Sequence, residues 1–251
     1  MKRYILFTVI ILFCCGCNFH RKAESTDTAD IKLDTVTLSD PARNRKIPVA
    51  FYDPGSENPE VVVFSHGYGQ NRRKSYLAYS YLTHFLALKG YFVVSVQHEL
   101  PTDELIPSAG IPQIVRRPFW ERGADNILFV INQLKKDDPR LNFRKITLIG
   151  HSNGADMTAL FPQKYPHIAH KIITLDNRRM VLPRDKNLKV YTLRSSDQPA
   201  DEGVLPTDPE IRKFEITIIK LSDVKHNDMD DHADAVQRKE IQDYILKFLK
   251  D

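Results

Sequence analysis

Cysteine is almost missing from this chain of 251 residues: its three copies, Cys14, Cys15 and Cys17, all lie near the N-terminus. The residues after Cys17 therefore form no disulfide with one another, and they offer no thiol nucleophile and no thiolate ligand for a metal. Their stability has to come from an ordinary apolar core, and any covalent catalysis has to use another nucleophile.

An excess of charge is missing as well, since 36 Lys and Arg side chains oppose 32 Asp and Glu side chains. The balance becomes closer still without Lys2 and Arg3, which belong to a leader segment. Such a chain gives no reason to expect nucleic acid as a partner.

Long apolar runs are limited to the N-terminus, where residues 4–13 follow Lys2 and Arg3 and precede small residues that end at Cys17. The run is too short to span a bilayer comfortably and has the charged start of a secretory signal. Its ending, Cys-Cys-Gly-Cys, resembles a bacterial lipoprotein signal, in which the cysteine after a small residue is acylated. We therefore predict a signal peptide over residues 1–17, a lipid on Cys17, export to the periplasmic or cell-surface side, and a membrane that holds the anchor.

The rest of the chain divides into a polar tether, predicted over residues 18–33, and one domain, predicted over residues 34–251. About 215 residues are enough to bury a sizeable sheet. Two β-rich runs open the domain, and strands then alternate with helical patterns, which predicts an α/β fold with a doubly wound, mostly parallel sheet and helices on both faces. Strands are expected at 34–40, 46–54, 60–67, 91–99, 145–151, 170–176, 188–195 and 214–221, and helices at 75–90, 123–136, 153–162, 207–214 and 236–250.

The segment KITLIGHSNGADMTAL, residues 145–160, joins a β-rich run directly to a helical pattern through Gly-x-Ser-x-Gly. A tight turn that exposes a serine hydroxyl needs glycine at positions 150 and 154, because Cβ atoms there would crowd it. A serine that only caps the helix would not need both glycines. We therefore predict that Ser152 is a nucleophile, which requires a base within hydrogen-bond reach, and that His151 beside it is structural.

The same chemistry requires two backbone N–H groups for the oxyanion. One is expected from Asn153, which follows Ser152 at a helix N-terminus where amides point outward. The second is expected from Tyr68, in the loop Ser-His-Gly-Tyr-Gly of residues 65–69, because the flanking glycines let the Tyr68 amide turn toward a cleft.

Five stretches of the chain resemble the α/β-hydrolase fold, and within it the platelet-activating-factor acetylhydrolase-like and dienelactone-hydrolase-like esterases. They are VVVFSHGYG, GYFVVSVQHE, GHSNG, ITLD and KHNDMDD, which together span residues 61–231 in the family's order of serine, acid and histidine. The resemblance implies hydrolysis of a carboxylic ester or a similar acyl bond in a small or lipid-like substrate, without a metal or another cofactor.

The resemblance also implies that His226 is the base for Ser152, since His226 follows the last expected strand and a short loop. The stretch HNDMDDHAD has an alternative interpretation as a metal site, formed by His226 with Asp228, Asp230, Asp231 and His232. No further ligands occur elsewhere at a suggestive spacing. We therefore expect the acidic run to cap the final helix, where negative charge is favoured.

The acid of the triad is left open between two aspartates. Asp197 lies just past the seventh expected strand, the commonest location in this fold, whereas Asp176 ends the sixth, where the platelet-activating-factor branch keeps its aspartate. Either carboxylate can hold the imidazole in the productive tautomer. Asp201 is a third candidate, and pairing with Arg178 and Arg179 is the alternative role for Asp176.

Only about a dozen residues separate the sixth and seventh expected strands, which leaves no room for a large cap domain. We therefore expect an open cleft with residues 100–122 and the loop 197–207 as its walls. His66 and His98 lie close to strand ends and are expected to line the pocket.

The sequence thus predicts a serine esterase that works through an acyl-enzyme. Two alternatives stay open. One is a serine peptidase or amidase on the same fold, and the other is a lipid-anchored binding protein that keeps the fold without the activity.

Overall fold

A computed structural model of the protein describes residues 31–251. The predicted signal peptide, Cys17 and nearly all of the predicted tether lie outside these residues. Among the helices of residues 31–251, none is both long enough and apolar enough to cross a bilayer.

One sheet of eight strands organises the described residues, in the order β1-β2-β4-β3-β5-β6-β7-β8. β1 and β2 pair antiparallel, β2 and β4 pair antiparallel, and the remaining pairs are parallel. The predicted α/β fold, with its β-β opening and mostly parallel sheet, is confirmed. The strands are β1 (Lys32–Asp40), β2 (Arg45–Asp53), β3 (Glu60–Ser65), β4 (Phe92–Val96), β5 (Asn142–His151), β6 (Lys171–Leu175), β7 (Lys189–Arg194) and β8 (Thr217–Lys220).

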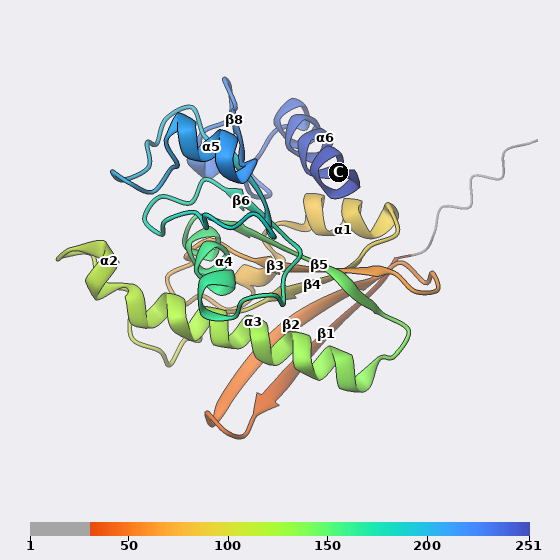
Figure 1. Ribbon diagram of the computed structural model, residues 1–251. Coiled ribbons are helices and arrows are strands. Elements are labelled where there is room, and N and C mark those ends of the chain that lie inside the picture. Colours follow the sequence, from red (N-terminus) through yellow and green to blue (C-terminus); the bar gives the residue numbers. More distant parts are fainter. Residues whose placement is uncertain (1–30) are drawn as a thin grey trace, which may run out of the picture.

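Helices cover both faces of the sheet, with α1 and α6 on one face and α3 and α4 on the other (Figure 1). Successive residues of β3 alternate between the two cores, because Val61 and Val63 pack with α3 and α4 while Val62 and Phe64 pack with α1 and α6. A strand buried on both faces has to be apolar where both faces are covered, as residues 61–64 of β3 are. The helices are η1 (Ser75–Leu77), α1 (Ser80–Leu88), α2 (Pro112–Val115), α3 (Arg117–Asp137), α4 (Asn153–Lys164), α5 (Asp208–Phe214), η2 (His226–Asp228) and α6 (Ala235–Lys250).

Residues 100–122 differ from the predicted long connection. α2 forms within this segment, and α3 begins at Arg117 rather than at residue 123. Pro112 and Pro118 explain the difference, because each occupies the first turn of its helix. Proline suits that position, where its missing N–H needs no partner and its fixed φ matches the helix. Two of the prolines that indicated a loop in the sequence are therefore helix-start residues in the structure.

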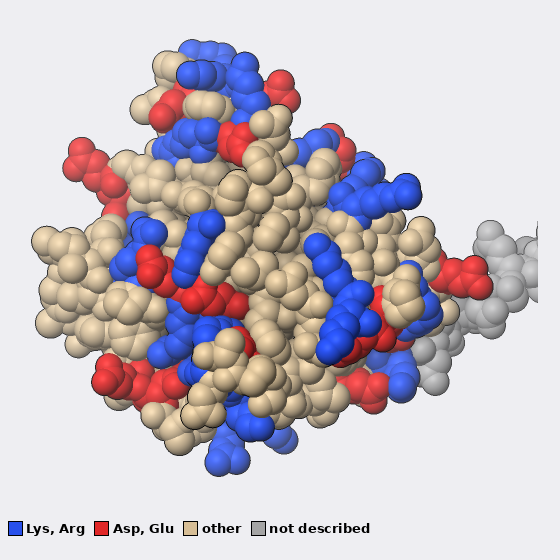
Figure 2. Space-filling model, turned by 60° about the horizontal axis from the view of Figure 1, so that its bottom comes forward, with Lys and Arg blue, Asp and Glu red and all other residues tan. Residues whose placement is uncertain are grey.

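Charges of both signs are mixed on the face that Figure 2 brings forward, where Lys and Arg side chains alternate with Asp and Glu side chains. Ion pairs among the described residues include Arg45 with Asp103 at 2.7 Å and Arg140 with Asp138 at 2.7 Å. The distribution on this face matches the near balance of charge in the whole chain.

Candidate active site

The nucleophile turn, residues 150–154, joins β5 to α4. Ser152 has φ 52° and ψ −118°, a conformation that residues other than glycine rarely adopt and that is typical of strained functional positions. A Cβ atom on Gly150 would lie 2.4 Å from the Gly154 carbonyl oxygen, and one on Gly154 would lie 2.3 Å from the Ser65 carbonyl oxygen. The turn therefore needs both glycines, and it presents Ser152 at the carboxyl end of β5.

Gly154→Ala is expected to lower the free energy of unfolding by about 3 kcal/mol or more. The added methyl group would meet the backbone carbonyl oxygens of Ser65 and His66 at 2.3 Å and 2.4 Å, and backbone atoms cannot turn aside. Urea unfolding followed by circular dichroism measures the loss. Gly123→Ala in α3 is the matched control, since its methyl group would meet the flexible Met157 side chain. Equal losses in the two variants would contradict the argument.

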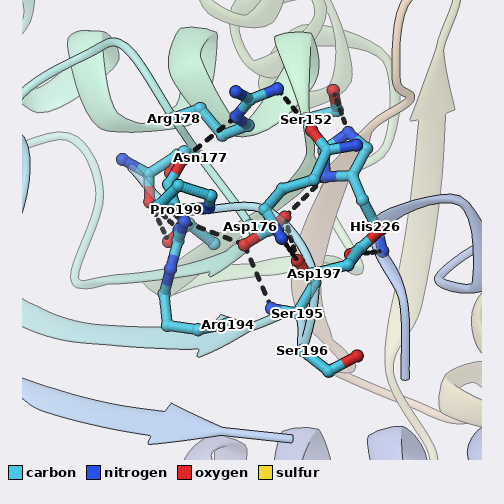
Figure 3. Close-up of polar contacts among 12 residues, drawn as sticks. Ser152, Asp176, Asn177, Arg178, Arg194, Ser195, Ser196, Asp197, Pro199 and His226 are labelled. Carbon is cyan, nitrogen blue, oxygen red and sulfur yellow. Dashed lines mark hydrogen bonds and ion pairs between the residues drawn. The ribbon is translucent and has the colours of Figure 1, made fainter. Parts of the chain in front are cut away.

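Three side chains from distant parts of the chain form one hydrogen-bonded line (Figure 3). Ser152 Oγ lies 2.8 Å from His226 Nε2, and His226 Nδ1 lies 2.5 Å from Asp176 Oδ2. Ser152 follows β5, Asp176 follows β6, and His226 lies beyond β8 at the start of η2. The carboxyl ends of parallel strands meet at one edge of a sheet, which brings the predicted nucleophile, the predicted base and one predicted acid together.

Asp176 is fully buried and is surrounded by donors. Its Oδ1 accepts from the Ser195 backbone N–H at 3.1 Å, its Oδ2 accepts from Ser195 Oγ at 2.7 Å, and an Arg194 guanidinium nitrogen lies 2.8 Å from Oδ1. Burial alone would raise the pKa of Asp176, but the His226 hydrogen bond, the positive charge of Arg194 and the Ser195 contacts outweigh it and hold that pKa below its usual range. The carboxylate is therefore ionised and fixed in direction against the imidazole.

Asp197 contacts the backbone of His226 rather than its ring. Its Oδ1 accepts from the backbone N–H of His226 at 2.7 Å (Figure 3). The two predicted acids thus divide between the two ends of one histidine: Asp176 contacts the ring, and Asp197 fixes the main chain that carries it.

The remaining candidates near the acid have other contacts. Asp201 Oδ2 accepts from Gln113 Nε2 at 2.9 Å, away from the imidazole. The backbone N–H groups of Arg178 and Arg179 donate to Asp156 Oδ1 at 3.1 Å and 3.0 Å. Among the described residues, the arginine that pairs with Asp176 is Arg194, and neither Arg178 nor Arg179 forms an ion pair with it. The alternative in which Arg178 and Arg179 pair with Asp176 is therefore wrong.

Arg194 and Ser195, which the sequence analysis missed, are the residues that hold Asp176. A signal for them was present, because they end the strand next to the one that Asp176 follows, and β6 and β7 run parallel in register, with Leu175 beside Leu193. The ends of neighbouring parallel strands lie side by side, so polar residues there were candidates for mutual contact.

The two predicted oxyanion donors lie beside the nucleophile. Asn153 is the first residue of α4, so its N–H belongs to the terminal groups that have no acceptor within the helix. The loop of Tyr68 is tied to the nucleophile turn through Tyr79, whose hydroxyl accepts from the Gly67 N–H at 2.9 Å and lies 2.7 Å from His151 Nδ1.

A cavity of about 710 Å³ opens over Ser152 and His226. Its walls come from residues 67–79 and 226–232, so the prediction that residues 100–122 and 197–207 form the walls is wrong. Residues 100–122 instead contact a residue of the cavity wall, since the Ile106 backbone N–H donates to the Tyr68 hydroxyl at 3.1 Å.

The acidic stretch after His226 serves helix starts. Asp231 accepts from the backbone N–H groups of Ser80 and Tyr81 at 3.0 Å each, at the start of α1. Asp234 caps α6, as the acidic run was expected to do. Among residues 31–251, no three His, Cys, Asp or Glu side chains are grouped as a metal would require.

Three other histidines lie near strand ends, and only one of them reaches the cavity. His66 and His98 are each 1% exposed and do not line the cavity, contrary to the prediction. His151 does line it, with its ring centroid 4.8 Å from that of His226. Burial lowers the pKa of His151 to about 3, so this ring is neutral where it packs against the His226 imidazole.

Comparison with known proteins places the fold. No protein-family model and no curated protein matches the chain, whereas many solved structures do. A thermostable esterase is matched with a TM-score of 0.58 at 16% identity, over 87% of this chain and 62% of the esterase, so the chain spans less than two thirds of that protein. A fungal esterase from Rhizomucor miehei is matched with a TM-score of 0.60 at 12% identity, over 90% of this chain and 84% of the esterase. A dienelactone hydrolase-like promiscuous phosphotriesterase from metagenomic libraries is matched with a TM-score of 0.61 at 16% identity, over 88% of this chain and 98% of the phosphotriesterase. The protein has the α/β-hydrolase fold.

Proposed function

We propose that this protein is a serine hydrolase that cleaves carboxylic esters, with Ser152 as nucleophile, His226 as base and Asp176 as acid. The observation that carries the proposal is the hydrogen-bonded line from Ser152 Oγ through the imidazole to a buried, ionised carboxylate. The fold neighbours named esterase and dienelactone hydrolase-like support the same class, of which the dienelactone hydrolase-like branch also matches in length.

The proposed reaction passes through an acyl-enzyme. His226 Nε2 takes the Ser152 proton as Oγ attacks the acyl carbon, and Asp176 stabilises the imidazolium that forms. The backbone N–H groups of Tyr68 and Asn153 donate to the oxyanion. His226 then protonates the leaving alcohol, and it later activates a water molecule that releases the acid and restores the serine.

A fluorophosphonate probe and a panel of chromogenic esters test the proposal. The probe is expected to label Ser152, identified by mass spectrometry of the tryptic peptide, because it needs an activated serine. Aryl esters of increasing acyl length are expected to be hydrolysed faster than peptide anilides. Faster cleavage of the anilides would support the peptidase alternative, and absence of both labelling and turnover would support the inactive binding protein.

We propose separately that the hydrolase is exported and held at a membrane by a lipid on Cys17. Cys17→Ser is expected to move most of the protein from the membrane fraction to the soluble fraction, because the acyl chains that supply the membrane affinity would be lost. Fractionation of the host bacterium followed by immunoblotting measures the change. Cys15→Ser is the matched control, and equal release of both variants would contradict the assignment to Cys17.

A further inference from the structure

Behind the nucleophile turn lies a buried polar cluster that the proposed reaction does not use. Its members are Glu99 and His66, each 1% exposed, and Asn153, 5% exposed. His66 follows β3, Glu99 lies beyond the end of β4, and Asn153 begins α4, so three elements of the sheet edge contribute one side chain each. Polar groups are costly to bury without partners, so the partners of this cluster are informative.

His66 determines the direction of one peptide group. Its Nε2 accepts from the His98 backbone N–H at 3.2 Å, which leaves the ring proton on Nδ1, and Nδ1 donates to the Gly67 carbonyl oxygen at 2.6 Å. Burial lowers the pKa of His66 to about 4, so the ring is neutral, as this tautomer requires. In a trans peptide, the carbonyl of Gly67 and the N–H of Tyr68 point in opposite directions. A carbonyl held toward the interior therefore turns the Tyr68 N–H toward the cavity.

The Asn153 side chain is held from two sides. Its Nδ2 donates to Glu99 Oε1 at 2.9 Å, and its Oδ1 accepts from Trp120 Nε1 of α3 at 2.8 Å. The nitrogen and the oxygen of the side-chain amide thus both have a partner, and the first residue of α4 is fixed beside Ser152. Because the Asn153 side chain is held in place, the direction of the Asn153 backbone N–H is held as well.

Glu99 connects the two halves of the cluster. Its second oxygen, Oε2, is buried without a hydrogen-bond partner among the described residues and lies 3.7 Å from His66 Nε2. Burial raises the pKa of Glu99 to about 7. One buried carboxyl group thus contacts Asn153 directly and borders the ring that holds the Gly67 carbonyl.

We propose that His66 and Glu99 are positioning residues for the two oxyanion donors, with His66 directing the Tyr68 N–H and Glu99 directing the Asn153 N–H. The inference rests on the proposed function. The two residues touch no substrate, and their effect passes through the backbone groups that they orient. The hydrogen bonds that His66 and Asn153 make inside the protein hold each side chain in one direction, and an oxyanion hole depends on its geometry being set before the reaction.

His66→Leu is expected to lower kcat for an aryl ester by about 10- to 100-fold with KM within about 3-fold, somewhat less than loss of a complete oxyanion donor costs. His98→Leu is the matched control, because both ring nitrogens of His98 lack partners among the described residues and the ring makes no bond to lose. His66→Asn is expected to recover much of the rate, since its amide nitrogen takes the place of Nδ1. His66→Gln, whose nitrogen takes the place of Nε2, is not.

Glu99→Leu is expected to lower kcat by about 10-fold or more, whereas Glu99→Gln keeps an acceptor for Asn153 and is expected to retain most of the rate. An aryl trifluoromethyl ketone provides the second measurement, because its adduct with Ser152 carries an oxyanion. Across the variants, its inhibition constant is expected to rise by the same factor as kcat/KM falls. Titration with a fluorophosphonate to its endpoint corrects each rate for the fraction of active protein.

Equal losses of kcat in His66→Leu and His98→Leu, or a rise in KM without a loss of kcat, would overturn the proposal and would indicate an effect on general packing. If His66→Leu does not fold, the pair His66→Asn and His66→Gln decides the same question. Unchanged ketone affinity in Glu99→Leu would remove Glu99 from the proposal. A wild-type protein that hydrolyses no ester and is not labelled would instead refute the proposed function itself, which is a different result.

Discussion

Ser152→Ala is expected to lower kcat for an aryl ester on the order of 10⁶-fold, the loss that follows removal of a triad serine. The reason is that Ser152 Oγ is the one atom deleted, and it is the atom that lies 2.8 Å from His226 Nε2. Stopped assays with purified protein measure the rate, and labelling by the fluorophosphonate is expected to disappear in parallel.

The fold is expected to survive this substitution. Alanine adopts the φ of 52° at position 152 at about the same cost as serine, since both carry a Cβ atom. Ser65→Ala is the matched control, because Ser65 is buried at the end of β3 and its hydroxyl has no hydrogen-bond partner among the described residues. Comparable loss of rate in the two variants, or residual rate in Ser152→Ala above about one hundredth of wild type, would exclude Ser152 as the nucleophile.

The sequence was sufficient to bring Ser152 and His226 together. Gly150 and Gly154 are both needed, because a Cβ atom on Gly150 would meet the Gly154 carbonyl oxygen and one on Gly154 would meet the carbonyl oxygens of Ser65 and His66. The Gly-x-Ser-x-Gly pattern that results can be recognised in the sequence. His226 follows the last strand, and the order of strands in the sheet determines which edge it reaches. The alternation of apolar runs predicted a mostly parallel sheet, which the structure confirms, but it did not predict the order of the strands. The role of His226 was predicted from the family resemblance.

The choice of acid was not predictable in the same way. Asp176 follows β6 and Asp197 lies just beyond β7, and these neighbouring parallel strands end at the same edge. Either carboxylate was therefore within reach of the histidine. The outcome depends on the direction of individual side chains: Ser195 and Arg194 hold Asp176 toward the ring, and Asp197 turns to a backbone N–H. Periodicity and spacing carry no information about such directions.

The walls of the cavity were mispredicted for a related reason. The segment 100–122 looked irregular because it is rich in proline, but two of its prolines, Pro112 and Pro118, start helices. No prediction was made for residues 70–74, where Asn71 is buried and its Nδ2 donates to the carbonyl oxygen of Asp103 at 2.8 Å. That contact fixes the loop beside the nucleophile, and it joins residues far apart in sequence.

Asp176→Asn is expected to lower kcat by about 10⁴-fold with little change in KM, since asparagine offers the imidazole the wrong hydrogen-bond partner and stabilises no imidazolium. Asp197→Asn is the matched control and is expected to lose about 10-fold or less, because an amide oxygen still accepts from the His226 N–H. Steady-state kinetics on both variants with one aryl ester measures the difference. A reversed order would transfer the role of acid to Asp197.

The same substitution is expected to reveal what the buried carboxylate contributes to stability. Asparagine leaves Arg194 buried without its counter-charge, which costs about 3 to 5 kcal/mol. Because folding lowers the pKa of Asp176, its contribution to the free energy of unfolding is complete above the ordinary carboxyl value of 3.8 and is lost as the pH falls through the lower folded value. Wild type and Asp176→Asn are therefore expected to differ most near neutral pH and to converge in acid, as urea unfolding at a series of pH values measures. A difference that stays constant into acid would mean that Asp176 is not held ionised by Arg194 and the His226 ring, and the electrostatic basis of the proposed triad would fail with it.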